Sequence, residues 1–310
     1  MRAVRIHQFG DPDVLTLDDI SKPNPDSTEV LVRVRAASVN PIDCKTRQGS
    51  AISVELPWTV GWDVTGVVES VGVNVTDFSE GDEVYGLIEF PDGGGTYAEY
   101  TAAPANELIQ KPAELSFEEA AATPLVSLTA WEALDATEVK NDTRVLIHAA
   151  AGGVGHFAVQ FAKEWGAHVI GTASGANKDY LRDLGADEIV NYREQRFEET
   201  IDPVDAVVDT IGGETFTQSL EVLNDGGIID KLPGELSDQQ LENAEEHNVQ
   251  AVHTSVRPNQ EWFAEITGLV SDGTVSPTID TVVPLSDAQR AHKLSEEGHT
   301  RGKLVLTMDE

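Results

Sequence analysis

Residues 150–155, Ala-Ala-Gly-Gly-Val-Gly, have the residue types and spacing of a turn that binds phosphate. They follow an apolar run at residues 144–149, typical of a strand, and precede a helical pattern at residues 156–165. Glycines let the backbone approach a pyrophosphate and let helix and strand pack closely, and the helix start offers free amides. The sequence therefore predicts a dinucleotide-binding turn, with Gly152, Gly153, Val154 and Gly155 as cofactor-binding residues.

Ala150 departs from the usual pattern, which has glycine at its first position, so an ordinary glycine-rich turn is the alternative. The surrounding segment favours the cofactor interpretation. Strands and helices alternate from about residue 141, with further strands expected at residues 168–172, 188–190, 204–209, 227–231 and 249–254. This alternation predicts a parallel, doubly wound sheet. Ile211 follows one of its strands and is expected to line the cofactor path, because ligands bind where such strands end.

The end of the second strand in this region indicates which nicotinamide cofactor is bound. An NAD site usually has an acidic residue there, which holds the ribose 2′-hydroxyl. This chain has Gly-Thr-Ala-Ser-Gly at residues 171–175 and no acidic residue before Asp179, which leaves room for a 2′-phosphate. We therefore expect NADPH, with Ser174, Lys178 and Tyr192 as phosphate ligands. The alternative roles are a solvated helix lysine for Lys178 and a loop anchor for Tyr192.

The first hundred residues are predicted to be rich in strands. Residues 29–36 alternate apolar and polar side chains, and residues 64–75 and 83–88 are further strand candidates. Many short strands with regular turn signals favour a compact barrel. Ser116 and Glu119 have the spacing of a capping box ahead of an alanine-rich helix. The alternation ends near residue 257, and a final strand at residues 303–307 is expected to return to the first domain.

Several motifs in a fixed order carry a family resemblance. They are residues 40–49 (NPIDCKTRQG), 60–66 (VGWDVTG), 81–86 (GDEVYG), 95–100 (GTYAEY), 149–163, 207–213 and 302–305 (GKLV). Together they resemble the zinc-free quinone oxidoreductases of the medium-chain dehydrogenase/reductase superfamily. The resemblance implies an α/β protein with a discontinuous GroES-like β-barrel domain at residues 1–120 and 258–310 and a Rossmann domain at residues 121–257. It also implies a cofactor between the domains and a homodimer joined through the edges of the Rossmann sheets.

The same resemblance argues against a metal. Zinc-dependent members of the superfamily have a cysteine and a histidine as catalytic ligands where this chain has Asn40 and Trp62, which cannot complete such a site. A structural zinc site needs four cysteines, and Cys44 is the only one, which also excludes an intramolecular disulfide. We interpret Cys44 as a small buried residue rather than a reactive thiol. Without a Lewis acid, reversible alcohol oxidation is disfavoured.

Quinones and α,β-unsaturated carbonyls need a hydride donor held in line and a group that stabilises the charge developing on oxygen. The resemblance points to Asn40 and Lys45 as the catalytic residues. Asn40 would donate a hydrogen bond to that oxygen or fix the nicotinamide ribose, and Lys45 would hold the ribose hydroxyls or stabilise the enolate. The alternatives are a turn asparagine and a solvated loop lysine. Thr129 would bond the nicotinamide ribose or phosphate, and Val256 would flank the nicotinamide. The final proton would come from water.

Lys45 also bears on the substrate. Many quinone oxidoreductases have a tyrosine at this position, and lysine resembles the plant-type subgroup that reduces enones, enals and quinones. We expect NADPH-dependent reduction of quinones, with reduction of the carbon–carbon double bond of enones or enals as the alternative. A non-catalytic cofactor-binding protein is a third interpretation. It is disfavoured because Asn40 and Lys45 accompany a complete phosphate-binding turn.

The composition restricts the partners and the compartment. The chain has 310 residues, 21 basic against 54 acidic, for a formal net charge of −33. This charge argues against nucleic acid or an anionic membrane as a partner. An acidic, lysine-poor surface suits a salt-rich cytoplasm; the alternative is an acidic protein of a mesophile. No signal peptide and no apolar run of eighteen residues is evident, so we expect a soluble cytoplasmic protein.

Overall fold

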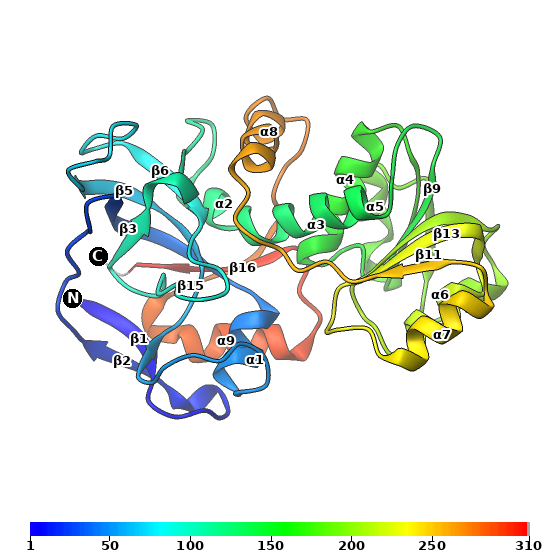
Figure 1. Cartoon of the computed structure of the whole chain (residues 1–310), viewed down its shortest axis with the longest axis horizontal. Coiled ribbons are helices and arrows are strands. Elements are labelled where there is room, and N and C mark those ends of the chain that lie inside the picture. The colour runs from blue at the N-terminus through cyan, green and yellow to red at the C-terminus, as the bar shows by residue number, and fades with distance from the viewer. Residues whose placement is uncertain (309–310) are drawn as a thin grey trace. The chain divides into compact units, whose positions relative to one another are not determined.

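The computed structural model describes residues 1–308, which form two compact units (Figure 1). The first unit contains Met1–Leu128, Arg257–Gly273 and the segment from Pro277 onward. The second contains Thr129–Val256 and the short segment Thr274–Ser276. Within the described part of the chain, no helix combines the length and the apolar content needed to cross a membrane.

The first unit is built on two β-sheets. One has the order β2-β1-β4, and the other has the order β15-β16-β3-β5-β6-β8, with β7 also paired to β3. The strands are β1 (Arg2–Ile6), β2 (Leu15–Asp19), β3 (Glu29–Val39), β4 (Trp58–Thr59), β5 (Asp63–Val71), β6 (Glu83–Leu87), β7 (Tyr100–Pro104), β8 (Ile109–Gln110), β15 (Ile279–Pro284) and β16 (Lys303–Thr307). The last strand along the chain pairs with β3 and so belongs to the first unit.

The apolar residues of the alternating pattern at residues 29–36 are buried, as expected for a half-buried strand. Val30, Val32 and Val34 of β3 are buried in one apolar cluster with Val64 and Val84 from the neighbouring strands. Two register shifts between β3 and β5 interrupt this regular pairing. Such bulges increase the local twist and bend a sheet towards a barrel. The long strand β3 ends at Val39, directly before the first of the candidate functional residues.

The helices of the first unit are short. They are α1 (Pro41–Arg47), α2 (Phe117–Ala121), α8 (Gln260–Ser271) and α9 (Ala288–Glu297), with 3-10 turns η1 (Pro12–Val14), η2 (Ala105–Glu107) and η5 (Leu285–Asp287). The capping box predicted at Ser116 is present, because Ser116 and Glu119 each accept a hydrogen bond from the other's backbone amide. The helix after it is interrupted: α2 ends at Ala121, and α3 (Pro124–Ala136) begins anew at a proline, which favours the first position of a helix.

The second unit confirms the predicted parallel, doubly wound sheet. Its six strands have the order β11-β10-β9-β12-β13-β14, and every pairing is parallel. Counted along the chain, this is the order 3-2-1-4-5-6 of a Rossmann fold. The elements are β9 (Arg144–Ile147), α4 (Gly153–Glu164), β10 (His168–Ala173), η3 (Gly175–Asn177), α5 (Lys178–Asp183), β11 (Glu188–Asn191), η4 (Phe197–Glu199), β12 (Val204–Asp209), α6 (Glu214–Leu220), β13 (Leu223–Lys231), α7 (Asp238–Glu246) and β14 (Gln250–Val252).

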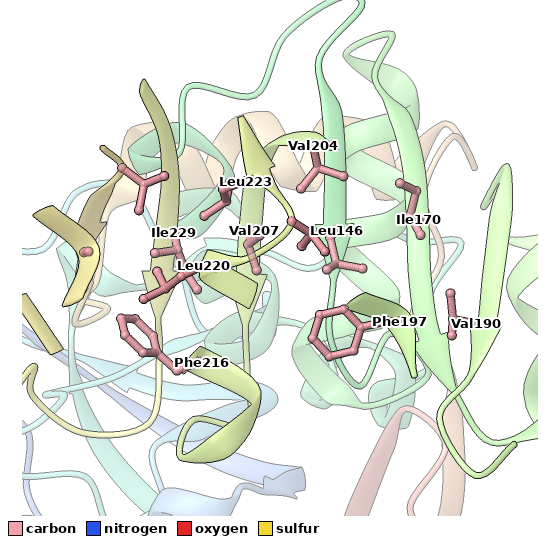
Figure 2. Packing of buried hydrophobic residues seen from close by; sticks show 13 residues of the cluster. Leu146, Ile170, Val190, Phe197, Val204, Val207, Phe216, Leu220, Leu223 and Ile229 are labelled. Carbon is pink, nitrogen blue, oxygen red and sulfur yellow. The ribbon is translucent and has the colours of Figure 1, made fainter. Parts of the chain in front are cut away.

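The core on one side of this sheet joins strands to the segments that cover them. Figure 2 shows Leu146, Ile170 and Val207 on neighbouring strands, with Phe197 and Phe216 from η4 and α6 in the same cluster. Such strands are buried on both faces, so their sequences read as apolar runs rather than alternating patterns. Because β9, β10 and β12 are parallel neighbours held in this core, their carboxyl ends lie along the same side of the sheet.

Candidate functional site

The turn between β9 and α4 is held tightly against β10. The Ala150 amide donates to the carbonyl of Thr172 at 3.0 Å. A Cβ on Gly155 would lie 2.4 Å from the carbonyl oxygen of Ala149 and 2.6 Å from the Cα of Ala150, so only glycine fits there. At Gly152, which precedes the helix, the nearest atom to a Cβ would be 3.2 Å away. Gly155 therefore lets the helix start lie directly on the turn, as expected from the sequence.

Ala150, the departure from the usual glycine pattern, is accommodated by Gly171 on β10. Ala150 is fully buried. A Cβ on Gly171 would lie 3.0 Å from the Cβ of Ala150. The methyl group thus occupies space that a glycine on the neighbouring strand leaves open. The first amides of α4, from Gly153 and Val154 onward, lack carbonyl partners within their own helix and can bind an anion.

The residues expected to hold a 2′-phosphate come from two neighbouring segments. Ser174 follows β10 and is half-buried, and Lys178 is exposed at the first position of α5. Tyr192 follows β11 and is 55% exposed. Its amide donates to the carbonyl of Ala173 at 3.3 Å, which brings the ends of β10 and β11 together. The structure therefore places all three in the second unit, at the carboxyl ends of adjacent parallel strands.

The other candidate cofactor residues are more dispersed. Ile211 follows β12 and is 51% exposed; its turn is fixed because Oδ1 of Asp209 accepts from the amides of Ile211 and Gly212, both at 2.9 Å. Thr129 is half-buried on α3, and Val256 is buried where the second unit ends. None of these contacts assigns Thr129 or Val256 a role in binding.

Asn40 lies in the first unit, between β3 and α1, and is fully buried. Its backbone amide donates to Oδ2 of Asp43 at 2.6 Å, which caps the start of α1. Its side-chain amide donates to Oδ2 of Asp63 at 2.8 Å, and its side-chain oxygen accepts from Nζ of Lys303. The amide oxygen and one amide hydrogen of Asn40 are therefore engaged within the protein.

These contacts belong to a buried cluster of charges that the sequence did not reveal. Asp63 also accepts from the Ser38 hydroxyl and from the Leu125 amide at 2.8 Å, and Lys303 also donates to the carbonyl of Val39 at 3.0 Å. Burial is the main cause that raises the pKa of both carboxyls, Asp43 to about 7, and that lowers the pKa of Lys303. The charge of Lys303 acts on both carboxyls and lowers the pKa of each, against the effect of burial.

The three charged residues of this cluster all belong to sequence motifs that carry the family resemblance. Asp43 belongs to the segment at residues 40–49, Asp63 to residues 60–66 and Lys303 to residues 302–305. Each lies in a motif whose pattern does not indicate that the three side chains meet. Their convergence requires β16 to pair with β3 and β3 with β5, which are contacts between distant parts of the chain.

Lys45 and Cys44 are neighbours on α1 that differ in exposure. The Lys45 side chain is exposed, whereas Cys44 is only 3% exposed. The Cys44 sulfur lies 3.4 Å from Nδ1 of His292, and burial raises the pKa of the thiol to about 12. The structure therefore makes Cys44 a packed side chain and leaves Lys45 as the accessible cation of α1.

Trp62 and Asn40 occupy the positions of the catalytic zinc ligands, and both are engaged in other buried contacts. Trp62 is fully buried, and its ring packs against those of Trp58 and Phe90, with centroids at 5.1 Å and 5.3 Å. Asn40 is engaged as described above. Among residues 1–308, no group of three or more His, Cys, Asp or Glu side chains is placed to hold a metal ion.

Two family models match parts of this chain. The family model for the alcohol dehydrogenase GroES-like domain matches residues 26–113, and the model for zinc-binding dehydrogenase matches residues 184–306. The first match confirms the GroES-like domain predicted from the sequence.

Individual proteins match over nearly the whole of this chain. The structure of the quinone oxidoreductase from Coxiella burnetii has a TM-score of 0.95 and 41% identity, covering 100% of this chain and 99% of that one. The Escherichia coli quinone oxidoreductase complexed with NADPH has a TM-score of 0.91 and 30% identity, covering 99% and 100%. The NADPH-dependent alkenal/one oxidoreductase of Arabidopsis thaliana chloroplasts is 35% identical over 99% of this chain and 79% of its own length.

Proposed function

The chain belongs to the medium-chain dehydrogenase/reductase superfamily, as a quinone oxidoreductase-like member, and from this premise we propose that it reduces quinones with NADPH and without zinc. It is an NAD(P)H-dependent oxidoreductase. NADPH is its cofactor, as it is of the Escherichia coli and Arabidopsis thaliana relatives.

One observation carries the proposal: a glycine turn at the end of β9 lies beside a β10 end that has no carboxylate. Gly155 leaves no room for a Cβ, so the amides at the start of α4 lie close to the strand end, where a pyrophosphate would bind. Ser174 follows the end of β10, where an NAD site would place an acid. Lys178 begins α5, and Tyr192 follows the neighbouring strand β11. The residues present therefore fit a dinucleotide that carries a 2′-phosphate.

NADPH, when bound, supplies the hydride. Lys45 then provides the positive charge, either by holding the ribose hydroxyls or by stabilising the negative charge that develops on the substrate oxygen. Its exposed position on α1 leaves the ammonium group accessible for this role. The product oxygen takes its proton from water.

We assign Asn40 a positioning role. Its side chain holds Asp63 and Lys303 while its backbone amide caps α1, the helix that carries Lys45. A buried asparagine with these partners fixes the direction of the first turn of α1. Thr129, Ile211 and Val256 complete the proposal as residues along the cofactor.

Independence from zinc is proposed because Asn40 and Trp62 are engaged in buried contacts at the positions of the catalytic ligands. Quinones are electrophilic, so their reduction needs an oriented hydride donor rather than a Lewis acid. We expect metal analysis of the purified protein to find less than stoichiometric zinc, and chelator treatment to leave the rate unchanged. One zinc per chain, or loss of activity on chelation, would contradict this part of the proposal.

Reduction of enones or enals is the second candidate, favoured by Lys45 within Asn-Pro-x-Asp-x-Lys and by the likeness to an alkenal/one oxidoreductase. The test is to follow NADPH oxidation with a benzoquinone and with a short-chain enone, and then with NADH in place of NADPH. We expect the higher kcat/KM with the quinone and with NADPH. A higher value with the enone would transfer the assignment to the second candidate. No oxidation with either would favour a non-catalytic cofactor-binding protein.

We also propose a homodimer formed through β14, the last strand in the order of the Rossmann sheet. The outer edge of such a strand offers backbone amides and carbonyls that a second copy can pair with. The chain has a mass of 33.4 kDa, and we expect sedimentation equilibrium to give twice this value. A monomer at micromolar concentration would contradict the proposal.

A further inference from the structure

Arg193 lies in the segment after β11, beside the candidate 2′-phosphate ligands. It follows Tyr192, whose amide is tied to the carbonyl of Ala173 at 3.3 Å. The pairing of Ala173 with Asn191 aligns the last residues of the parallel strands β10 and β11. The residues after β11 therefore lie next to the residues after β10, where Ser174 and Lys178 are found.

Local contacts orient the Arg193 side chain. Its backbone amide donates to Oδ1 of Asn191 at 3.2 Å, and its Nε donates to the Tyr192 hydroxyl at 3.4 Å. The guanidinium carbon lies 5.7 Å from the centroid of the Tyr192 ring. The Asn191 side chain in turn lies against Gly175, where a Cβ would come within 2.9 Å of Nδ2. The two segments are thus packed together, with Arg193 exposed on them.

Arg193 differs from nearby arginines in its charge environment. Arg182 is paired with Asp179 at 2.9 Å, and Arg196 is paired with Glu198 at 2.7 Å and with Glu199 at 2.9 Å. Within residues 1–308, neither Arg193 nor Lys178 forms an ion pair with a carboxylate. The chain has 54 acidic residues against 21 basic ones, so two cations without an acidic partner at one strand end are available for an external anion.

We infer that Arg193 is a ligand of the 2′-phosphate of NADPH and determines, together with Lys178, the preference for NADPH over NADH. This inference rests on the proposed function, which takes NADPH as the cofactor. A guanidinium group has a planar set of donors that matches two phosphate oxygens, whereas an ammonium group acts as a single point charge. The Tyr192 hydroxyl accepts from Nε and so leaves the terminal nitrogens of Arg193 for the phosphate.

The test is calorimetric titration of the full chain with NADP⁺ and with NAD⁺ at one low salt concentration. We expect Arg193→Ala to weaken NADP⁺ binding about ten- to a hundredfold, the effect of losing a charge-assisted contact, and to change NAD⁺ binding less than about twofold. Arg193→Lys keeps the charge and should lose less. Arg182→Ala removes the same charge from a paired arginine nearby and should leave the ratio of the two affinities unchanged.

The outcomes separate this inference from the proposed function. If the wild type binds neither dinucleotide, the use of NADPH fails and the inference fails with it. If the wild type binds both equally, the preference for NADPH fails, and with it the role of Arg193 in that preference. If the wild type prefers NADP⁺ and Arg193→Ala keeps the full preference, only the role of Arg193 is overturned. Equal weakening for both dinucleotides would also overturn it, because that result indicates stacking on the shared adenine ring or a disturbed fold. Parallel unfolding curves check the fold of each variant.

Discussion

At the residue scale, the start of α1 depends on a shared charge. Asp43 and Asp63 are fully buried with Lys303, and Asn40 connects all three. Asp63 accepts from three donors, Ser38, Asn40 and Leu125. Asp43 accepts from two, the Asn40 amide and, at 3.4 Å, the Tyr97 hydroxyl, both on Oδ2, and its Oδ1 is buried without a partner. A carboxylate with several donors is the one that stays ionised. Asp63 therefore balances Lys303, and Asp43 takes up a proton near neutral pH.

This assignment predicts a pH dependence of stability. Burial raises the pKa of Asp43 from 3.8 to about 7, so the folded chain binds a proton that the unfolded chain releases between these values. This proton makes its full contribution to the free energy of unfolding below pH 3.8, and the contribution is lost as the pH rises through 7. We expect the free energy of unfolding of the wild type, relative to Asp43→Asn, to fall by about 2 kcal/mol from pH 5 to pH 7.

Urea unfolding at the two pH values gives this difference, and comparison with the variant cancels titration elsewhere in the chain. Asp19→Asn, which changes an exposed carboxylate on β2, serves as the control and should leave the profile unchanged. A wild-type and an Asp43→Asn profile that run parallel from pH 5 to pH 7 would show that Asp43 is ionised throughout.

Lys45 is the second residue with a direct prediction. Lys45→Ala removes the accessible cation of α1 without removing a buried contact, because its side chain is exposed. Losing one charge-assisted hydrogen bond in the transition state costs roughly 1.5–3 kcal/mol, so kcat/KM for the quinone should fall about ten- to a hundredfold. Lys293→Ala, at another exposed lysine of the same unit, should retain activity. An unchanged kcat/KM in Lys45→Ala would remove this residue from the mechanism.

At the element scale, the cofactor turn depends on how closely α4 approaches β9. A Cβ added at Gly155 would lie within 3 Å of backbone atoms of Ala149 and Ala150. Backbone atoms cannot move aside as the end of a side chain can. Ala149 already has a positive φ of 45°, which shows how tightly the chain turns. The helix can present its first amides to an anion only while this approach is kept.

Gly155→Ala should therefore destabilise the protein and weaken NADP⁺ binding. Overpacking of this kind costs roughly 1–3 kcal/mol. Gly268→Ala is the matched control, because Gly268 is exposed on α8 with no atom within 4 Å of its Cβ position. Alanine in a helix interior should stabilise that variant by about 0.5–1 kcal/mol. Thermal unfolding and NADP⁺ titration measure both effects, and equal stability of the two variants would be the contrary result.

At the scale of the whole molecule, the dominant property is the net charge of −33. Some acids are neutralised in ion pairs, such as Asp187 with Lys163 at 2.9 Å, but 21 basic residues cannot pair with 54 acidic ones. The remaining like charges repel one another and favour the expanded, unfolded chain. Salt shortens the range of this repulsion from about 10 Å at 0.1 M to about 3 Å at 1 M.

We therefore expect Tm to rise between 0.1 M and 1 M potassium chloride, by roughly 2–4 °C for each kcal/mol of repulsion that is screened. Differential scanning calorimetry at constant pH measures this, and sodium chloride at matched ionic strength serves as the control for screening by any salt. A Tm that is constant or falls over this range would contradict the proposal that the surface is adapted to high salt.

The sequence by itself determined the features that depend on neighbours along the chain. The glycine turn, the missing acid after residue 173 and the capping box at Ser116 are all local patterns, and the structure places each on the expected element. The parallel Rossmann sheet also followed from the sequence, because repeated strand–helix alternation allows few other arrangements.

Only the tertiary structure decided which side chains meet across long separations. Asn40 contacts Lys303, and Tyr192 contacts the end of β10, because strand pairing brings those segments together. It also decided that Asn40 is enclosed while Lys45 stays exposed, although the two are five positions apart. The physical reason is that burial and charge pairing depend on the whole packed unit. Local pattern fixes the type of an element, whereas the partners of its side chains are fixed by the elements that pack against it.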